Sequence, residues 1–322
     1  MKTLCVLGCT GQLGSYLVDI GLEAGYRVIG VKRRSSTNNL WRIAHVDSPH
    51  FTLIEGDITD PFSMLGIFSN YYIDYCVNTA AQSHVHTSFN EPVHTLDVTG
   101  KAVVNILEAI RRVSPHTSFV QMSSSEQFGS NQDQYGMQSE ETPFMANSPY
   151  AAAKIYAHQM TNLYRECYDL HCSCAIAFNF ESSRRGEEFV TRKITQYIGR
   201  LKKLGFAKVG KLKLGNTHSW RDWSYAGDTA GGVFILLHSS KAGNYCFSSQ
   251  QCNRVQDFVE LAFSLADLDW HEYVDIDPFL FRPKEVPLLH GNSTRARTEL
   301  VWEPQVKFEQ LVEMMVRADI ER

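Results

Sequence analysis

The amino-acid sequence predicts an α/β fold, a doubly wound parallel sheet with a second, smaller domain. Three observations lead to this prediction. Short apolar runs alternate with helical patterns through the first half of the chain. A glycine-rich segment separates the first apolar run from the first helical pattern, and beyond Asn179 the alternation gives way to a stretch rich in Arg and Lys. Alternating strands and helices are typical of the Rossmann arrangement, a parallel sheet wrapped by helices.

The expected elements follow one another in a regular order. The expected strands cover residues 4–7, 27–31, 51–54, 72–77, 118–122 and 172–178, and the expected helices cover residues 12–23, 93–112 and 150–168. Six or seven strands of this kind make a doubly wound sheet with helices on both faces.

The change of rhythm also predicts the domain organisation. Residues 1–180 are expected to form a dinucleotide-binding domain, and residues 181–322 mainly a substrate-binding domain. The second part contains an Arg-rich segment over 182–186, a basic helix over 191–204 and a strand over 211–214. Residues 219–250 are expected to return to the first domain, through a helix over 228–238 and a strand over 244–248.

The composition limits the classes of partner. The 31 Lys and Arg residues are balanced by 35 Asp and Glu residues, so the net charge of −4 gives no reason to expect nucleic acid. The eight cysteines lack the Cys-x-x-Cys spacing of zinc sites, and we interpret them as buried thiols in a reducing compartment. No apolar run approaches the ~20 residues of a membrane span. We therefore expect a cytoplasmic protein that uses neither membrane nor metal.

The glycine-rich segment predicts a dinucleotide site. Gly8, Gly11 and Gly14 lie between the first strand and the first helix, where bare backbone lets a pyrophosphate approach the helix N-terminus. Thr10 and Gln12 belong to the same loop and are expected to contribute to it. A plain tight turn is the alternative, but the strand before and the helix after the glycines favour the cofactor site.

The end of the second strand predicts which cofactor binds. No acidic residue follows Val31 to hold a free ribose 2′-hydroxyl; the sequence has Lys32 and then Arg33, Arg34, Ser35 and Ser36. Arginines at this place suit a 2′-phosphate, which favours NADP over NAD. A solvated basic loop is the alternative.

Further polar residues follow the third and fourth strands, at the carboxyl edge where an open parallel sheet binds its ligand. These cofactor candidates are Asp57, Ala80, Ala81, Gln82 and Ser83. Asp57 could equally cap a helix.

A catalytic group is expected at the next two elements. Tyr150 and Lys154 lie four residues apart on one helical face, so the ammonium can stabilise the phenolate of a tyrosine base. Ser124 stands at the end of the preceding strand, as the serine of a Ser-Tyr-Lys dehydrogenase triad should. Glu126 is the discriminating residue, because hydride transfer needs no carboxylate there, whereas removal of a proton beside a ketone does. A solvated loop glutamate is the alternative.

At these residues the sequence resembles the GDP-mannose 4,6-dehydratase family of extended short-chain dehydrogenases. The match runs through nearly the whole chain, and its most specific string covers residues 181–193. The other matching segments are residues 33–36, 56–57, 80–85, 88–89, 124–126, 214–216, 221–223 and 281–286. Five positions depart from the family pattern: Leu13 replaces Asp, His94 replaces Tyr, Ser124 replaces Thr, Phe180 replaces His and Ser183 replaces Pro.

The resemblance implies a function and a set of ligand contacts. It implies that GDP-mannose is converted to GDP-4-dehydro-6-deoxy-mannose with internal hydride transfer through NADP, by a homodimer or homotetramer. It implies that Lys154 and Arg185 contact NADP, and that the GDP-sugar is held by Ser83, Asn179, Lys193, Arg221, Arg282 and Glu285. The alternatives are an NADP-dependent GDP-sugar reductase or epimerase on the same scaffold and a catalytically silent NADP-binding module.

Overall fold

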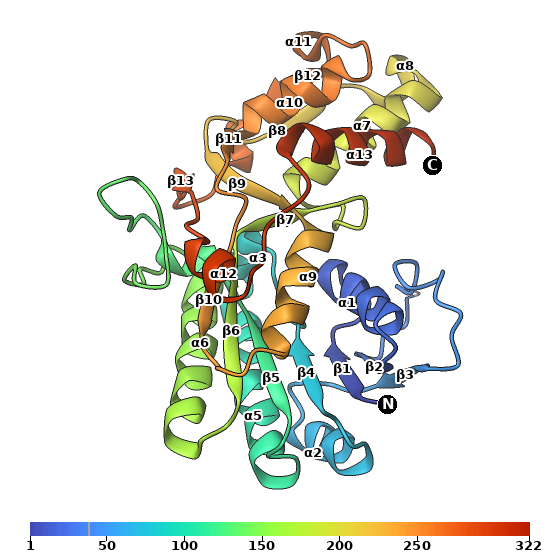
Figure 1. Ribbon diagram of the computed structural model, residues 1–322. Helices are drawn as coiled ribbons and strands as arrows, with labels where there is room; N and C mark the ends of the chain where they lie inside the picture. The colour runs from blue at the N-terminus through green and yellow to red at the C-terminus, as the bar shows by residue number, and fades with distance from the viewer. Residues whose placement is uncertain (38) are drawn as a thin grey trace.

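The central sheet of the computed structural model has seven parallel strands in the order β10-β6-β5-β4-β1-β2-β3. The structure describes residues 1–37 and 39–322. The strands of this sheet are β1 (Thr3–Leu7), β2 (Arg27–Lys32), β3 (Phe51–Glu55), β4 (Tyr75–Asn78), β5 (Ser118–Ser124), β6 (Cys172–Ala177) and β10 (Asn244–Phe247). The chain winds outward in opposite directions from β1 and β4 (Figure 1). The prediction of a doubly wound α/β fold is therefore confirmed.

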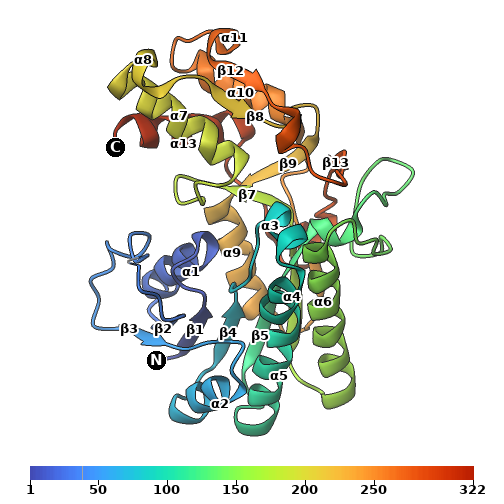
Figure 2. The same cartoon turned by 180° about the vertical axis from the view of Figure 1, so that it is seen from behind.

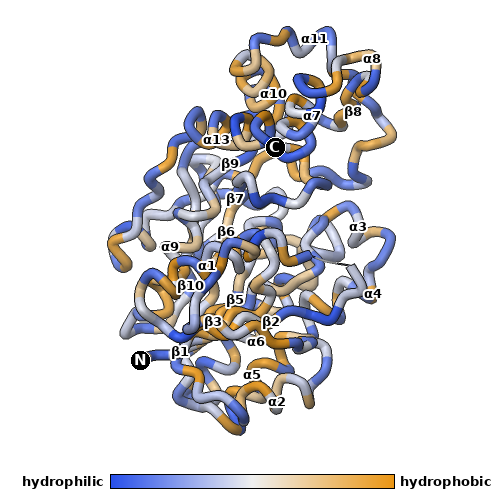
Figure 3. Tube along the Cα trace, turned by 90° about the vertical axis from the view of Figure 1, so that its right-hand side faces the viewer, coloured by the Kyte–Doolittle hydropathy of each residue, from blue (hydrophilic) through white to orange (hydrophobic). Residues whose placement is uncertain are grey.

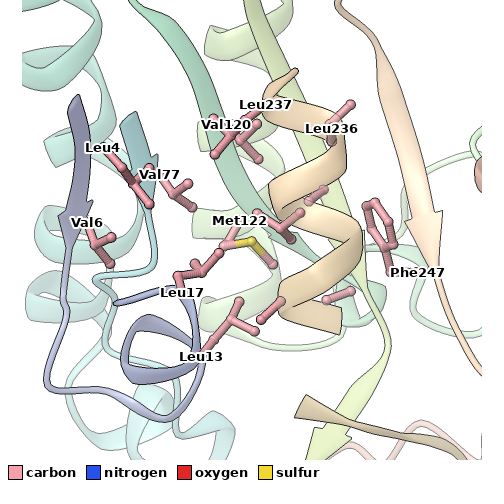
Figure 4. Packing of buried hydrophobic residues seen from close by; sticks show 14 of the residues in the cluster. Leu4, Val6, Leu13, Leu17, Val77, Val120, Met122, Leu236, Leu237 and Phe247 are labelled. Carbon is pink, nitrogen blue, oxygen red and sulfur yellow. The ribbon is translucent and has the colours of Figure 1, made fainter. Parts of the chain in front are cut away.

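Helices cover both faces of this sheet, because successive residues of a strand point to opposite sides. In β1, Leu4 and Val6 belong to the core on one face, and Cys5 and Leu7 belong to the core on the other. The helices over the first face are α1 (Gln12–Glu23) and α9 (Ala226–Leu237); those over the second are α2 (Pro61–Asn70), α5 (Ala102–Val113) and α6 (Pro149–Tyr168). Figure 4 shows the leucines of α1 and α9 directed toward the strands, and Figure 3 shows the hydrophobic stretches gathered along the central strands.

A smaller unit with its own core lies over the carboxyl edge of the sheet (Figure 1). Its strands are β7 (Asn179–Glu181), β8 (Leu212–Leu214), β9 (Trp220–Tyr225), β11 (Cys252–Arg254), β12 (Val274–Ile276) and β13 (Leu288–Leu289). Its helices are α7 (Val190–Leu204), α8 (Phe206–Val209), α10 (Val255–Ser264), α11 (Trp270–Tyr273), the 3₁₀ turn η3 (Pro278–Leu280) and α13 (Phe308–Ile320).

The chain passes between the two units more than once. Within residues 219–250, β9 pairs with β7, β11 and β13 of the small unit. The next two elements belong to the large unit: α9 packs on a face of the large sheet, and β10 pairs with β6 at its edge. A later helix, α12 (Thr294–Glu299), packs beside β10, and Trp302 enters the core under α9. The large unit is thus assembled from several separate stretches of chain.

The single helix predicted over residues 93–112 is wrong in detail. The structure has α4 (Pro92–Thr95), then a π-helical turn η1 (Leu96–Lys101), then α5. The π turn presents Thr99 to the chain after β4, where its hydroxyl both donates to and accepts from the backbone of Gln82. Because Thr99 makes both of these hydrogen bonds, the helix widens locally into a π turn. A short helix α3 (Val85–Asn90) and a 3₁₀ turn η2 (Ser125–Phe128) complete the elements.

The eight cysteines are all unpaired, but they are not all buried as expected. Cys167 is exposed and Cys252 is half-buried. Cys167 lies in the last turn of α6. Within residues 1–37 and 39–322, no helix is long and apolar enough to cross a membrane. The same residues contain no group of three His, Cys, Asp or Glu side chains positioned to hold a metal ion.

Candidate active site

One cavity of about 770 Å³ lies between the carboxyl edge of the large sheet and the small unit. Its walls come from the segments that follow β1 to β6, and from α7, β8, β9 and α10 of the small unit. A crevice at the point where strand order reverses is the usual ligand site of an open parallel sheet. Most of the predicted site residues therefore line one space.

The glycine loop packs so closely that a side chain would not fit at its first or last glycine, and we call this loop the glycine cradle. Gly8 has φ +83°, and a Cβ on it would lie 2.8 Å from the nitrogen of Ala80. A Cβ on Gly14 would lie 2.3 Å from the carbonyl oxygen of Gly8. Gly11 donates to that same oxygen over 2.9 Å and caps α1 with backbone alone. The N-terminus of α1 consequently opens onto the cavity, where it favours an anion.

The basic loop after β2 divides into two pairs of residues. All four residues are exposed, but Arg33 and Ser35 line the cavity, whereas Arg34 and Ser36 lie outside its lining. Lys32 is paired with Glu55, whose Oε1 lies 2.9 Å from its ammonium. Arg33 is therefore the better placed of the two arginines for a bound ligand.

The segments after β3 and β4 are held by their own side chains. Asp57 lines the cavity and also accepts hydrogen bonds from the nitrogen and hydroxyl of Thr59 over 2.9 and 2.7 Å, so it caps a turn as well. Gln82 donates to the Thr95 hydroxyl and accepts from the nitrogen of His84. Ala80, Ala81 and Ser83 line the cavity beside them. The amide of Gln82 is thus largely occupied within the protein.

Tyr150 and Lys154 occupy the first turns of α6. Ser148 caps this helix by accepting from the nitrogen of Ala151 over 3.1 Å, and Pro149 occupies its first position. Both functional side chains are buried, at 7% and 4% exposure. Lys154 donates from Nζ to the carbonyl oxygen of Met122 in β5 over 2.7 Å, and its Nζ lies 5.8 Å from the centroid of the Tyr150 ring.

Burial shifts both groups toward their neutral forms. It raises the pKa of Tyr150 to about 12, with a hydrogen bond from Ser124 and the charge of Arg185 acting in the opposite direction and Glu126 adding to the rise. It lowers the pKa of Lys154 to about 8. A buried phenol and a buried amine in one cavity are typical of catalytic sites.

Glu126 is held at one end of a chain of alternating charges. Its nitrogen donates to the Ser124 hydroxyl over 3.3 Å, which fixes the turn after β5. Its Oε1 lies 3.5 Å from Nη1 of Arg282, and the same Nη1 lies 3.5 Å from Glu285. Glu285 in turn pairs with the buried Arg221 over 2.8 Å. Residues far apart in sequence thus place two carboxylates and two guanidinium groups in one wall of the cavity.

With this geometry established, comparison with known proteins decides the family. The model described as GDP-mannose 4,6 dehydratase matches residues 5–315. The chain belongs to the GDP-mannose 4,6-dehydratase family. The resemblance seen in the sequence is confirmed.

Relatives within this family cover nearly the whole chain. "GDP-mannose 4,6 dehydratase 1" of Arabidopsis thaliana is 42% identical over 99% of this chain and 90% of its own length. "GDP-mannose 4,6-dehydratase" of Yersinia enterocolitica is 37% identical over 100% of this chain and 95% of its own length.

Solved structures share the fold of this dehydratase family member. A dTDP-glucose 4,6-dehydratase from Bacillus anthracis superimposes with a TM-score of 0.85 at 22% identity, over 99% of this chain and 96% of that one. A UDP-glucose 4-epimerase from Thermotoga maritima superimposes with a TM-score of 0.86 at 21% identity, over 98% of each chain.

Arg185 is the predicted cofactor residue contributed by the segment after β7. Its Nε lies 3.2 Å from the buried Glu181, and its guanidinium lies 3.5 Å above the Phe189 ring. Thr191 donates to the same carboxylate over 2.6 Å. Burial raises the pKa of Glu181, while Arg185 and the hydrogen bond from Thr191 act in the opposite direction.

Two buried acceptors in the cavity wall have no hydrogen-bond partner among the described residues. They are Oε1 of Gln12 and Oδ1 of Asn179. The other end of the Gln12 amide donates to the carbonyl oxygen of Phe180 over 2.9 Å, which fixes its orientation. Buried unpaired acceptors in a cavity call for donors from a ligand.

The sequence reasoning assigned no role to several other residues near the cavity. His84, His94, Lys213 and Asn216 line it, as do the predicted Lys193 and the departures Leu13 and Phe180. Burial lowers the pKa of His84, with Glu188 raising it and Arg282 lowering it further. His84 and Asn216 lie inside segments that match the family, and this match could have identified them from the sequence. Arg42 lies outside the cavity lining and donates to the carbonyl oxygens of Thr10 and Arg184. None of the matching segments includes it.

Proposed function

We propose that this chain is a GDP-mannose 4,6-dehydratase, a hydro-lyase that converts GDP-mannose to GDP-4-dehydro-6-deoxy-mannose with NADP as its cofactor. The observation that carries the proposal is the buried Glu126 carboxylate in the same cavity as Tyr150, in a chain that matches this family from residue 5 to residue 315. A dehydrogenase or reductase needs the tyrosine alone, whereas elimination of water needs a second base.

The residues present fit an NADP molecule. The glycine cradle and the N-terminus of α1 suit a pyrophosphate, and Arg33 with Ser35 suits a 2′-phosphate at the cavity edge. The unpaired Oε1 of Gln12 offers an acceptor to an amide of the cofactor. Arg34, Ser36, Asp57, Ala80, Ala81 and Gln82 remain proposed members of this site. When bound, NADP supplies the acceptor that takes a hydride from the sugar and later returns it.

Tyr150 and its neighbours are proposed to carry out the first proton transfer. Tyr150 takes the proton of the sugar O4 hydroxyl as C4 is oxidised, and the Ser124 hydroxyl holds the oxygen in place. Lys154 lowers the cost of the phenolate by its positive charge, because its nitrogen lies within 5.8 Å of the ring centroid. Burial raises the pKa of the phenol to about 12, so this charge is needed at neutral pH.

Glu126 is proposed to carry out the second step. The C4 ketone acidifies the proton at C5. The carboxylate removes that proton and passes it to the C6 hydroxyl, which leaves as water as the C5–C6 double bond forms. Nη1 of Arg282 lies 3.5 Å from Oε1 of Glu126, and this pair holds the carboxylate in place for the step.

The side of the cavity that the small unit forms is proposed to bind most of the nucleotide sugar. Lys193, Arg221 and Arg282 bring positive charge that suits a diphosphate, and Glu285 can accept hydrogen bonds from a base or a sugar. Ser83 and the unpaired Oδ1 of Asn179 can bind sugar hydroxyls.

Incubation of the purified protein with GDP-mannose and NADP, followed by mass spectrometry, tests the proposal. A dehydratase yields a product lighter than GDP-mannose by one water, with no net consumption of cofactor. An epimerase yields a product of unchanged mass. A reductase finds no ketone to reduce in GDP-mannose and, like a silent binding module, yields no product. Either of these results would contradict the proposed function.

We further propose that the protein is a cytoplasmic homodimer or homotetramer. Three apolar side chains, Val93, Tyr156 and Leu163, are exposed on α4 and α6, which lie side by side with α5 on one surface (Figure 2). Apolar side chains exposed on neighbouring helices suit an interface between copies of the chain. Light scattering coupled to size-exclusion chromatography measures the oligomeric state, and a monomer at micromolar concentration would contradict the proposal.

A further inference from the structure

The carbonyl oxygens of Ser183 and Arg184 receive hydrogen bonds from three guanidinium groups that lie far apart in the sequence. Arg42 donates from Nε to the carbonyl of Arg184 over 2.6 Å. Arg322 donates to the carbonyl of Ser183 over 3.3 Å, and the buried Arg192 donates to the same oxygen. The segment held in this way carries Arg185 into the cavity.

Arg42 differs from the other two because it also contacts the glycine loop. Its Nη1 donates to the carbonyl oxygen of Thr10 over 3.2 Å. A guanidinium group is a rigid plane with its N–H groups in fixed directions, so the two carbonyls are held at a fixed separation. One plane thus joins the loop that cradles a pyrophosphate to the segment that carries Arg185.

The surroundings of Arg42 hold its side chain in this place. Its guanidinium carbon lies 4.2 Å above the ring of Trp41, and Ile43 is buried in the core under α1. The segment that contains Arg42 follows the basic loop over residues 33–36, and its other end is tied to α1 by the pair between His45 and Asp19, 2.7 Å apart. Arg42 is therefore anchored on both sides and can transmit a shift of one loop to the other.

We propose that Arg42 is a positioning residue that couples binding of the cofactor to binding of the nucleotide sugar. The inference rests on the proposed function, because it takes the glycine loop as the NADP site and the residues on either side of this segment, Asn179 and Lys193, as part of the site of the GDP-sugar. A ligand that orders the Thr10 loop fixes Arg42, and through Arg42 the backbone of Arg184. The second ligand then meets a segment that is already ordered and binds more tightly.

The test is a titration of the full-length protein with NADPH, with and without saturating GDP, followed by NADPH fluorescence. In the wild type we expect GDP to tighten NADPH binding by about fivefold or more, the usual lower range of coupling between sites. In Arg42→Met we expect this ratio to fall to about one, and in Arg42→Lys as well, because an ammonium keeps the charge but lacks the planar fork. Thermal melting of each variant reports whether it is folded. If Arg42→Met does not fold, Arg42→Lys alone provides the test.

Two matched variants separate coupling from general loosening. Arg322→Met removes one donor to the same segment but leaves the Thr10 contact, and Arg200→Met removes an exposed arginine on α7. Both are expected to keep the wild-type ratio. The inference is overturned if the Arg42 variants keep that ratio, if Arg322→Met loses it equally, or if the wild type itself shows a ratio of one. A wild type that binds neither NADPH nor GDP overturns the proposed function together with the inference, whereas a wild type that binds both without coupling overturns the inference alone.

Discussion

Lys154 donates a hydrogen bond to the backbone carbonyl of Met122, so its ammonium is fixed by the end of β5 and not by the side chain of Tyr150. The helix α6 places the two side chains one turn apart, and the strand determines where the charge lies. The ammonium therefore lies at a fixed distance from the Tyr150 ring. The cost of this arrangement is a buried amine whose pKa burial lowers to about 8.

The first prediction concerns that cost. Unfolding restores the ordinary pKa of 10.5 to Lys154, so between about pH 8 and 10.5 the unfolded chain binds more protons than the folded one. This group therefore makes the free energy of unfolding rise with pH in that window, and it destabilises the fold below pH 8 by about 3 kcal/mol. In Lys154→Met, loss of the hydrogen bond to the Met122 carbonyl cancels about 1 kcal/mol of the stability gained by removing the buried amine. We expect Lys154→Met to be about 2 kcal/mol more stable at pH 7 in urea denaturation, although less active.

The pH dependence of the difference provides the control for this prediction. The gain of Lys154→Met over the wild type should shrink as the pH rises from 8 toward 10.5, whereas an exposed control such as Lys203→Met should show no trend. A methionine variant less stable than the wild type at pH 7 would show that the amine contributes more by its hydrogen bond than it costs by burial.

The second prediction concerns the tyrosine. Tyr150→Phe removes the phenolic oxygen and leaves Lys154, Ser124 and the glycine cradle in place, so cofactor binding should be unchanged. Loss of a general base typically lowers the rate by about 10² to 10⁴-fold. Mixing the variant with NADP and GDP-mannose in a stopped-flow instrument should therefore show no rapid formation of NADPH. Wild-type turnover by this variant would remove Tyr150 from the mechanism.

The parts of the site that could be predicted from the sequence are those formed by neighbours along the chain. The glycine loop and the Tyr150–Lys154 pair depend on spacing within one turn or one helix, and the structure brings each together in one cavity. Strands of the large sheet could be predicted for the same reason, because burial on both faces leaves continuous apolar runs.

Contacts between distant segments could not be predicted in this way. The approach of Arg282 to Glu126 joins residues 156 positions apart, and the bond from Arg42 to Arg184 joins residues 142 positions apart. The π turn over Leu96–Lys101 arises from hydrogen bonds between Thr99 and Gln82, which no helical periodicity reveals. The small strands β7, β11 and β13 have two or three residues each, too few for a pattern.

The third prediction concerns cofactor choice. We expect NADP to bind more tightly than NAD, and because Arg33 lines the cavity and Arg34 does not, Arg33→Ala should weaken this preference more than Arg34→Ala. A charge-assisted hydrogen bond contributes about 1.5–3 kcal/mol, so the loss in NADP affinity should be about 10- to 100-fold for Arg33→Ala. Calorimetry with both cofactors measures it. NAD affinity is the internal control, since neither substitution should change it by much; equal affinity of the wild type for the two cofactors would contradict the prediction.

The last prediction is the sharpest test of the elimination step. Glu126→Gln has nearly the same shape, but its amide cannot take the C5 proton, while Tyr150, Lys154 and the cofactor site stay in place to oxidise C4. The variant should therefore form NADPH in a single turnover and then stall, so that the 6-deoxy product appears at least about 10²-fold more slowly than in the wild type. In deuterium oxide it should also exchange the C5 proton far more slowly. Glu285→Gln is the matched control, because Glu285 pairs with the same Nη1 of Arg282 but is proposed to bind substrate, so this variant should raise KM and still complete the dehydration. If Glu126→Gln makes the 6-deoxy product at an unchanged rate, Glu126 is not the base, and the reductase or epimerase reading becomes the better account of this cavity.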